Sequence, residues 1–228
     1  MTERPGTGRP HGRGLHATSL LALILFLAAC DTMVLEALEN IGIPKRDVLI
    51  DRIESAQEAQ EDGQEQFRSA LEQFKSVLAF DGGDLESAYN ALNGEYEDSV
   101  SAAEEISDRI DSVESVAEAL FTEWENELGE YTSASLRRDS ERQLRSTRVR
   151  YERLMTSMRS AERSIDPVLA SLKDNVLYLK HNLNARAIAS LRGELANVDS
   201  DVTRLLEAMN AAINESNAFI AELRSSGT

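Results

Sequence analysis

The side chains that most often carry enzyme chemistry are scarce in this sequence. Its 228 residues include three histidines, His11, His16 and His181, and one cysteine, Cys30. Metal sites in helical bundles use Glu-x-x-His pairs, but Tyr178 stands three residues before His181. A hydrolase of the nucleophile-elbow type needs a Gly-x-Ser-x-Gly turn, and the sequence has none. We therefore expect a protein that is not an enzyme and that holds no metal or other cofactor.

Two further motifs have both a chemical and a structural interpretation. Asp81-Gly82-Gly83-Asp84 resembles part of a calcium loop, but it lacks the alternation of oxygen ligands over twelve residues. A glycine turn followed by Asp84 as a helix cap explains it better. Trp124 and Tyr131 are candidates for a binding platform, although core packing is the preferred interpretation.

Charge is unevenly distributed along the chain. The 40 acidic and 24 basic residues give a net charge of -16, which argues against a nucleic-acid binder. Residues 51–130 hold 23 acidic and four basic residues, whereas residues 131–163 hold nine arginines and four acidic residues. Either the arginine-rich helix pairs with the acidic helix before it and sets its register, or it forms a surface for an acidic partner such as anionic lipid or a protein.

The N-terminus has the pattern of a secretory signal. Arg4, Arg9 and Arg13 precede an apolar run, Leu20–Leu27, that is too short to span a bilayer. The next residues complete Leu27-Ala28-Ala29-Cys30, which resembles the bacterial lipobox. We therefore expect residues 1–29 to be removed and Cys30 to be lipidated, and two or three acyl chains on one residue would anchor the protein firmly.

This anchor predicts where the mature protein lies. We expect it on the periplasmic side of the bacterial cell envelope, held by its lipid, with residues 30–43 as a tether to the body at 44–225. Asp31 follows the lipidated position, and in enteric bacteria an aspartate there favours retention on the inner membrane over the outer membrane.

The body that must position any functional side chain has the pattern of long helices. In the first segment, residues 53–78, apolar positions share one stripe, which glutamines interrupt. In residues 85–124 apolar positions alternate steps of four and three, which is the repeat of a coiled coil. The third segment spans Leu136 to Ile165, with Ser140 and Gln143 spaced as a capping box near its start, and the last spans 188–223. The fold class predicted is all-α, an elongated antiparallel coiled-coil bundle of three to four long helices.

The boundary between the third and fourth helices has two candidates. Asp166-Pro167 combines a cap with a residue suited to a first helical turn. The run from His181 to Asn184 is the alternative turn, since asparagine tolerates turn geometry. We favour four helices with a kink at Pro167.

Several runs resemble the domain of unknown function 2959 family over about residues 40–224. The resemblance implies a secreted or lipid-anchored helical protein and supplies no reaction, ligand or catalytic residue. The runs are Lys45-Arg46-Asp47 with Asp51-Arg52, Phe80-Asp81-Gly82-Gly83-Asp84-Leu85, Ala134-Ser135-Leu136-Arg137-Arg138, and Leu179-Lys180-His181-Asn182-Leu183-Asn184-Ala185-Arg186-Ala187-Ile188.

The last of these runs is the least coiled-coil-like part of the body. Its polar residues need partners, so it is either a polar turn or an interaction surface, and the arginine pair of the third segment is the next candidate. The predicted interaction residues are Arg137, Arg138, Lys180, His181, Asn182, Asn184 and Arg186.

The function expected is that of a non-enzymatic, lipid-anchored envelope protein that acts as a coiled-coil scaffold, spacer or interaction module for an envelope protein partner. The alternative is a bundle that binds a lipid or other amphiphile where polar residues interrupt the seam, at Gln57, Gln60, Gln64, Ser99, Ser140 and Thr147. Heptads form within or between chains, so they do not determine the oligomeric state.

Overall fold

The computed structural model describes residues 44–80, 82 and 84–225. The predicted signal peptide 1–29, the lipidation site Cys30 and the tether 30–43 lie outside these residues. The chain divides into two units after Pro44, and the second contains the described helices. They are α2 (Lys45–Leu78), α3 (Leu85–Glu127), α4 (Ala134–Arg163), α5 (Ile165–His181), α6 (Ala185–Leu191) and α7 (Leu195–Ser225).

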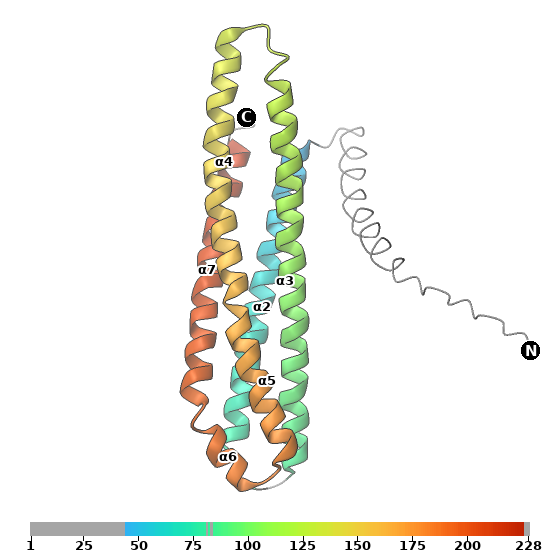
Figure 1. Ribbon diagram of the computed structural model, residues 1–228, viewed down its shortest axis with the longest axis vertical. Helices are drawn as coiled ribbons and strands as arrows, with labels where there is room; N and C mark the ends of the chain where they lie inside the picture. Colours follow the sequence, from blue (N-terminus) through green and yellow to red (C-terminus); the bar gives the residue numbers. More distant parts are fainter. Residues whose placement is uncertain (1–43, 81, 83, 226–228) are drawn as a thin grey trace, which may run out of the picture. The chain divides into compact units, whose positions relative to one another are not determined.

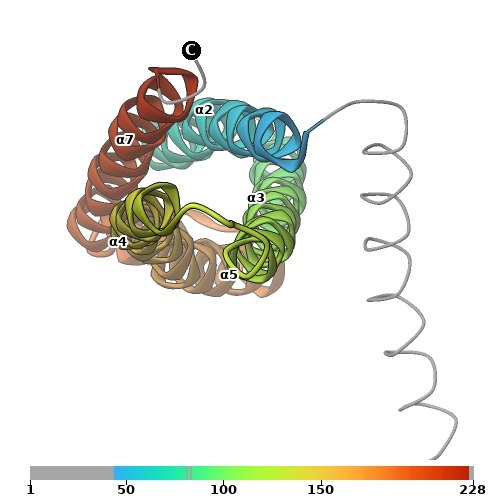
Figure 2. The same cartoon turned by 90° about the horizontal axis from the view of Figure 1, so that it is seen from above.

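The helices of this unit form an antiparallel bundle with four columns (Figure 1). α2 packs against α3 and α7, while α4 and α5 follow each other as one column that packs against the same two helices. Viewed along the bundle, α4 lies diagonally across from α2 (Figure 2). The 43 residues of α3 correspond to a helix of ~64 Å at 1.5 Å per residue. The predicted all-α, elongated antiparallel bundle is confirmed, and none of the described helices is long and apolar enough to cross a membrane.

The core follows the predicted stripes with one systematic difference. Ile106, Ile110 and Val113 of α3 are fully buried, as the heptad pattern predicts. Phe121, which lies off that pattern, is also buried, whereas Leu120 is only partly buried. The reason is that α3 packs on α2 and on the α4–α5 column at once, so its buried face is wider than a two-helix seam.

The column formed by α4 and α5 is interrupted at Ser164, three residues before Pro167, where the sequence predicts a kink. Pro167 lies in the first turn of α5, where its missing N–H needs no helical partner. The turn that reverses the chain is Asn182–Asn184, so each of the two candidate sites has a role. The short helix α6 and the turn at Arg192–Glu194 were not predicted, because apolar spacing continues through both.

The helix caps confirm one prediction and correct another. Asp84 caps α3 by accepting hydrogen bonds from the backbone N–H groups of Glu86 and Ser87, at 3.1 and 3.3 Å. The capping box at Ser140 is wrong, since α4 begins at Ala134 and Ser133 caps it. Ser140 is instead buried within α4.

Candidate functional site

The hairpin between α3 and α4 extends beyond the ends of α2 and α7 (Figure 1). At the start of α2, Lys45 Nζ lies 3.1 Å from Glu123 Oε1. Close to the end of α7, Glu222 pairs with Arg150 of α4. The residues between these two levels, 124–147, therefore have no third helix of the described chain beside them. We call them the hairpin tip, and it lies at the end of the bundle where the chain enters α2.

Side chains at the hairpin tip differ in how they are used. Trp124 is partly buried, and its Nε1–H donates to Ser140 Oγ at 2.8 Å across the hairpin. Tyr131 is 41% exposed and Leu136 59% exposed, so Trp124 and Tyr131 do not have the same environment. Arg137 pairs along its own helix with Glu141, at 3.1 Å.

Two of the nine arginines of α4 pair with the acidic helix α3, as one of the two interpretations predicts. Arg148 lies 2.7 Å from Glu125, and Arg159 lies 2.6 Å from Asp111 and 2.5 Å from Glu114. Partial burial disfavours the charge of Arg159, but hydrogen bonds to neighbouring carboxylates outweigh it and raise its pKa. These pairs fix how α4 sits on α3.

Four other arginines of α4 have no ion pair or hydrogen bond with any described residue. They are Arg138, Arg145, Arg153 and Arg163, all exposed. Arg145, Arg153 and Arg163 lie 7, 15 and 25 residues after Arg138, which at about 100° per residue places all four within an arc of about 80° on one side of α4. Leu154 and Met158, on the opposite side, are fully buried. We call these four residues the arginine face.

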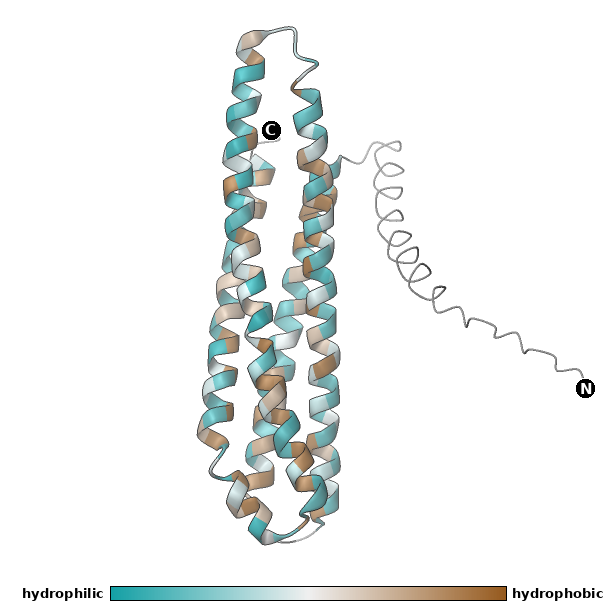
Figure 3. Cartoon of the chain, in the orientation of Figure 1, coloured by the Kyte–Doolittle hydropathy of each residue, from teal (hydrophilic) through white to brown (hydrophobic). Residues whose placement is uncertain are grey.

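The other end of the bundle, where α5 meets α6, exposes large apolar residues beside basic ones. Leu177, Tyr178 and Leu183 are 44%, 40% and 43% exposed. The helix ends there carry apolar positions, whereas the hairpin tip is mostly hydrophilic (Figure 3). Lys180, His181 and Arg186 are also exposed, and their side chains contact no described partner through a hydrogen bond or ion pair. We call these six residues the base surface.

The two asparagines in this region have structural roles. Asn184 caps α6 by accepting from the N–H groups of Arg186 and Ala187, at 3.0 and 3.1 Å. Asn182 Nδ2 donates to the carbonyl of Tyr178 at 2.9 Å. Of the predicted interaction residues, Arg137 and Arg138 lie at the hairpin tip and the others lie at the opposite end, so the structure does not bring them together.

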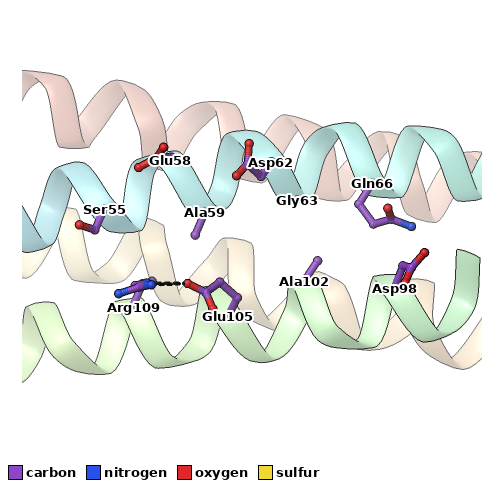
Figure 4. Close-up of a pocket in the computed structure, with 10 residues that line it drawn as sticks. All are labelled: Ser55, Glu58, Ala59, Asp62, Gly63, Gln66, Asp98, Ala102, Glu105 and Arg109. Atoms are coloured by element: carbon purple, nitrogen blue, oxygen red, sulfur yellow. Dashed lines mark hydrogen bonds and ion pairs between the residues drawn. The ribbon is translucent and has the colours of Figure 1, made fainter.

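A groove between α2 and α3 was not predicted from the sequence. It has a volume of about 440 Å³, and carboxylates from both helices line it (Figure 4). Arg109 pairs with Glu105 at 2.6 Å, whereas Glu58, Asp62 and Asp98 have no ion pair or hydrogen bond with a described residue. No sequence motif predicts the groove, because its residues come from two helices and only the register between these helices brings them together. We call it the acidic groove.

Small residues hold α2 and α3 close together at the acidic groove. A Cβ atom at Gly63 would lie 2.7 Å from Ile106 Cδ1, which is closer than normal packing allows. Ala59 and Ala102 line the same groove. Small side chains therefore form its floor, and carboxylates form its rims.

The polar residues that interrupt the predicted seam mostly find partners. Gln64 Nε2 donates to Asn210 Oδ1 at 3.4 Å, and Ser99 Oγ donates to the carbonyl of Glu95 at 2.7 Å. Gln60 is completely buried, and neither its amide nitrogen nor its amide oxygen has a hydrogen-bond partner among the described residues. This orphaned amide is the least satisfied polar group described in the core.

The fold and its surfaces define a helical-bundle protein with charged and apolar patches on the outside of the bundle. Among the described residues, no group of three or more histidine, cysteine, aspartate or glutamate side chains is placed to hold a metal ion. The chain belongs to the family described as protein of unknown function, DUF2959, whose model matches residues 34–223. This confirms the family resemblance. A search of the curated proteins found no match.

Proposed function

We propose that this protein is a non-enzymatic, lipid-anchored scaffold or spacer of the bacterial cell envelope, and that it binds a partner through the base surface. The observation that carries the proposal is the position of that surface. The chain enters the bundle at Lys45, beside the hairpin tip, and the base surface lies at the opposite end of the bundle (Figure 1). The base surface therefore lies at the far end of helices of up to ~64 Å from the point where the chain enters the bundle.

The chemistry of the base surface supports a protein partner. Exposed Leu177 and Leu183 offer apolar area, and Lys180, His181 and Arg186 surround it with basic groups. Such a patch rimmed by polar residues is typical of protein interaction sites. The partner predicted has an apolar centre and an acidic rim.

The partner test uses mild cross-linking in the native envelope, affinity purification and mass spectrometry. Leu177→Ser with Leu183→Ser should remove the partner. The matched control is Leu136→Ser, which changes an exposed leucine at the hairpin tip, and Arg137→Glu with Arg138→Glu gives a second control at that end. A partner lost only in the tip variants would contradict the base surface, and a protein that captures nothing would contradict the scaffold role.

The anchor is tested separately, by fractionation of cells that make the full chain. Cys30→Ser should lose incorporation of labelled fatty acid, and its share in the membrane fraction should fall. Wild-type protein that is released in soluble form would contradict the anchor, whatever the partner test shows.

The orphaned amide of Gln60 favours a second candidate function, the binding of a lipid or other amphiphile within the bundle. A polar ligand group that enters the core there would satisfy the amide. Native mass spectrometry of protein purified from its own envelope tests this. A stoichiometric small molecule that is lost in Gln60→Leu would support the carrier, and a protein free of ligand would exclude it.

A further inference from the structure

Two oppositely charged surfaces of the bundle have no partner within the described chain. The arginine face runs along α4, and the acidic groove lies between α2 and α3. α4 does not pack on α2, and the two helices are diagonal in the bundle (Figure 2). Hence these surfaces cannot meet within one copy. We propose that the arginine face of one copy docks in the acidic groove of a second copy of this chain.

The arginine face is longer than the acidic groove, so only part of it can dock there. From Arg138 to Arg163 the arginine face covers 25 residues of helix, or ~38 Å, whereas the groove covers 11 residues of α2, from Ser55 to Gln66, or ~17 Å. The acidic groove has carboxylates on both rims, with Glu58 and Asp62 on α2 and Asp98 on α3 (Figure 4). Because the groove floor is built from Gly63 and alanines, guanidinium groups can approach these carboxylates without displacing a large side chain. Pairs of this kind are favourable, since a guanidinium can bind a carboxylate through two hydrogen bonds.

A second copy fits these observations better than an anionic lipid surface. A lipid surface would satisfy the arginine face and leave the acidic groove empty. A second copy satisfies both surfaces with one type of contact. Because the contact joins two different surfaces, each copy keeps one free arginine face or one free groove, and copies can add in a row.

The contact is expected to be weak and sensitive to salt. A contact limited to the groove, ~17 Å long and ~10 Å wide, buries on the order of 200 Å² per copy, which is about a quarter of a standard interface. Exposed ion pairs contribute little individually and are screened within ~8 Å at physiological ionic strength. Association should therefore weaken at least about tenfold between ~50 and ~300 mM salt, and it would matter most for copies concentrated on a membrane.

The test is sedimentation velocity over a concentration series on Lys45–Thr228, a compact unit with its own core. One variant carries Arg138→Glu, Arg145→Glu and Arg153→Glu. A second carries Glu58→Lys, Asp62→Lys and Asp98→Lys. The control variant carries Lys173→Glu, Lys180→Glu and Arg186→Glu, which makes the same charge change as the first variant outside both surfaces. Circular dichroism checks that each variant is folded.

The proposal predicts that wild type and control associate at low salt, and that each of the two surface variants alone associates at least about tenfold more weakly. A mixture of the two variants should associate again. In the mixture the intact arginine face meets the intact groove, and the glutamate-substituted face meets the lysine-substituted groove. A wild type that stays monomeric at low salt up to ~1 mM would overturn it, and so would equal effects of the control and the arginine variant. If the wild type stays monomeric but floats with vesicles of anionic lipid, and the arginine variant does not, the occupant is a lipid surface and the proposal is wrong. The control variant alters the base surface but neither the arginine face nor the acidic groove. Loss of partner binding in the control and loss of self-association in the surface variants are therefore separate results.

Discussion

At the scale of single residues, Gln60 is the clearest cost in the core. It is 0% exposed, and both polar atoms of its amide lack a described partner. Leaving such a group unsatisfied costs about 1–3 kcal/mol. Its neighbour along the seam, Gln64, reaches Asn210 and avoids much of that cost. The same residue type therefore has different energetic roles one turn apart.

We expect Gln60→Leu to raise the free energy of unfolding by about 1–2 kcal/mol, because it removes an unsatisfied amide and keeps the volume. This corresponds to a rise in Tm of roughly 2–8 °C for a unit of this size. Urea unfolding followed by circular dichroism measures it. Gln57→Leu, at a partly exposed position where the amide bonds to Glu61, is the control and should change stability by less than about 0.5 kcal/mol. A less stable Gln60→Leu would mean that the amide has a partner in solution.

Tyr151 gives a second prediction at this scale. It lies between Phe121 and Phe219, with ring centroids 5.3 and 6.4 Å away. Burial raises the pKa of its hydroxyl above the ordinary value of 10.0, and the nearby Glu114 raises it further. The unfolded chain therefore loses this proton at a lower pH than the folded protein. The stability that the neutral hydroxyl contributes is fully present below pH ~10 and falls as the pH rises above it.

Tyr151→Phe should remove this part of the alkaline destabilisation. Melting curves at pH ~8 and ~11 should differ less in the variant than in wild type. Tyr131→Phe, at an exposed tyrosine of the hairpin tip, is the control and should leave the difference unchanged. An identical loss of Tm in wild type and Tyr151→Phe would show that Tyr151 titrates normally.

At the scale of helices, the packing of α2 on α3 depends on Gly63. A Cβ there would lie 2.7 Å from Ile106 Cδ1, whereas a Cβ at Gly94, in the third turn of α3, would meet no atom within 4 Å. Both glycines are helical, so both lose conformational entropy relative to alanine. They differ in the space around them.

Gly94→Ala is therefore expected to stabilise the bundle by about 0.5–1 kcal/mol, as alanine does at an open helical position. Gly63→Ala should destabilise it by about 1 kcal/mol, since overpacking outweighs the gain in helix propensity. Chemical denaturation of the two variants side by side measures the difference. If both substitutions stabilise equally, α2 and α3 are further apart than the structure shows.

At the scale of the whole bundle unit, stability should fall from the centre toward the hairpin tip. The tip has two helices and few buried residues, whereas residues 106–121 pack on helices of two other columns. Local opening is easiest where few apolar contacts hold a segment. Hydrogen exchange read by mass spectrometry should show the fastest amide exchange within the bundle helices at 124–147, and the slowest near Ile110. Equal protection in both segments would indicate that something not described covers the tip.

The sequence by itself determined the helical class, the family, the two long heptad segments and the cap at Asp84. These features depend on local propensity and on a repeat that a single chain segment contains. The interruption between α4 and α5 lies close to Pro167, where a kink was predicted for the same reason, because proline acts on its own helix. Some of the candidate interaction residues could also be predicted from the sequence, since polar residues interrupt the repeat there.

Only the tertiary structure shows which of the charged and apolar side chains pair or pack within the bundle and which remain exposed. Whether an arginine of α4 pairs with α3 or faces solvent depends on its angle around the helix and on which residue of the neighbouring helix lies beside it. The local sequence shows neither of these. Thus Arg159 is held by Asp111 and Glu114, while Arg153, only six residues before it, has no described partner. The same limit explains why Phe121 entered the core, why the acidic groove was missed, and why Arg138 and Arg186 lie at opposite ends. The register between helices determines all of these contacts, and it cannot be read from any single helix.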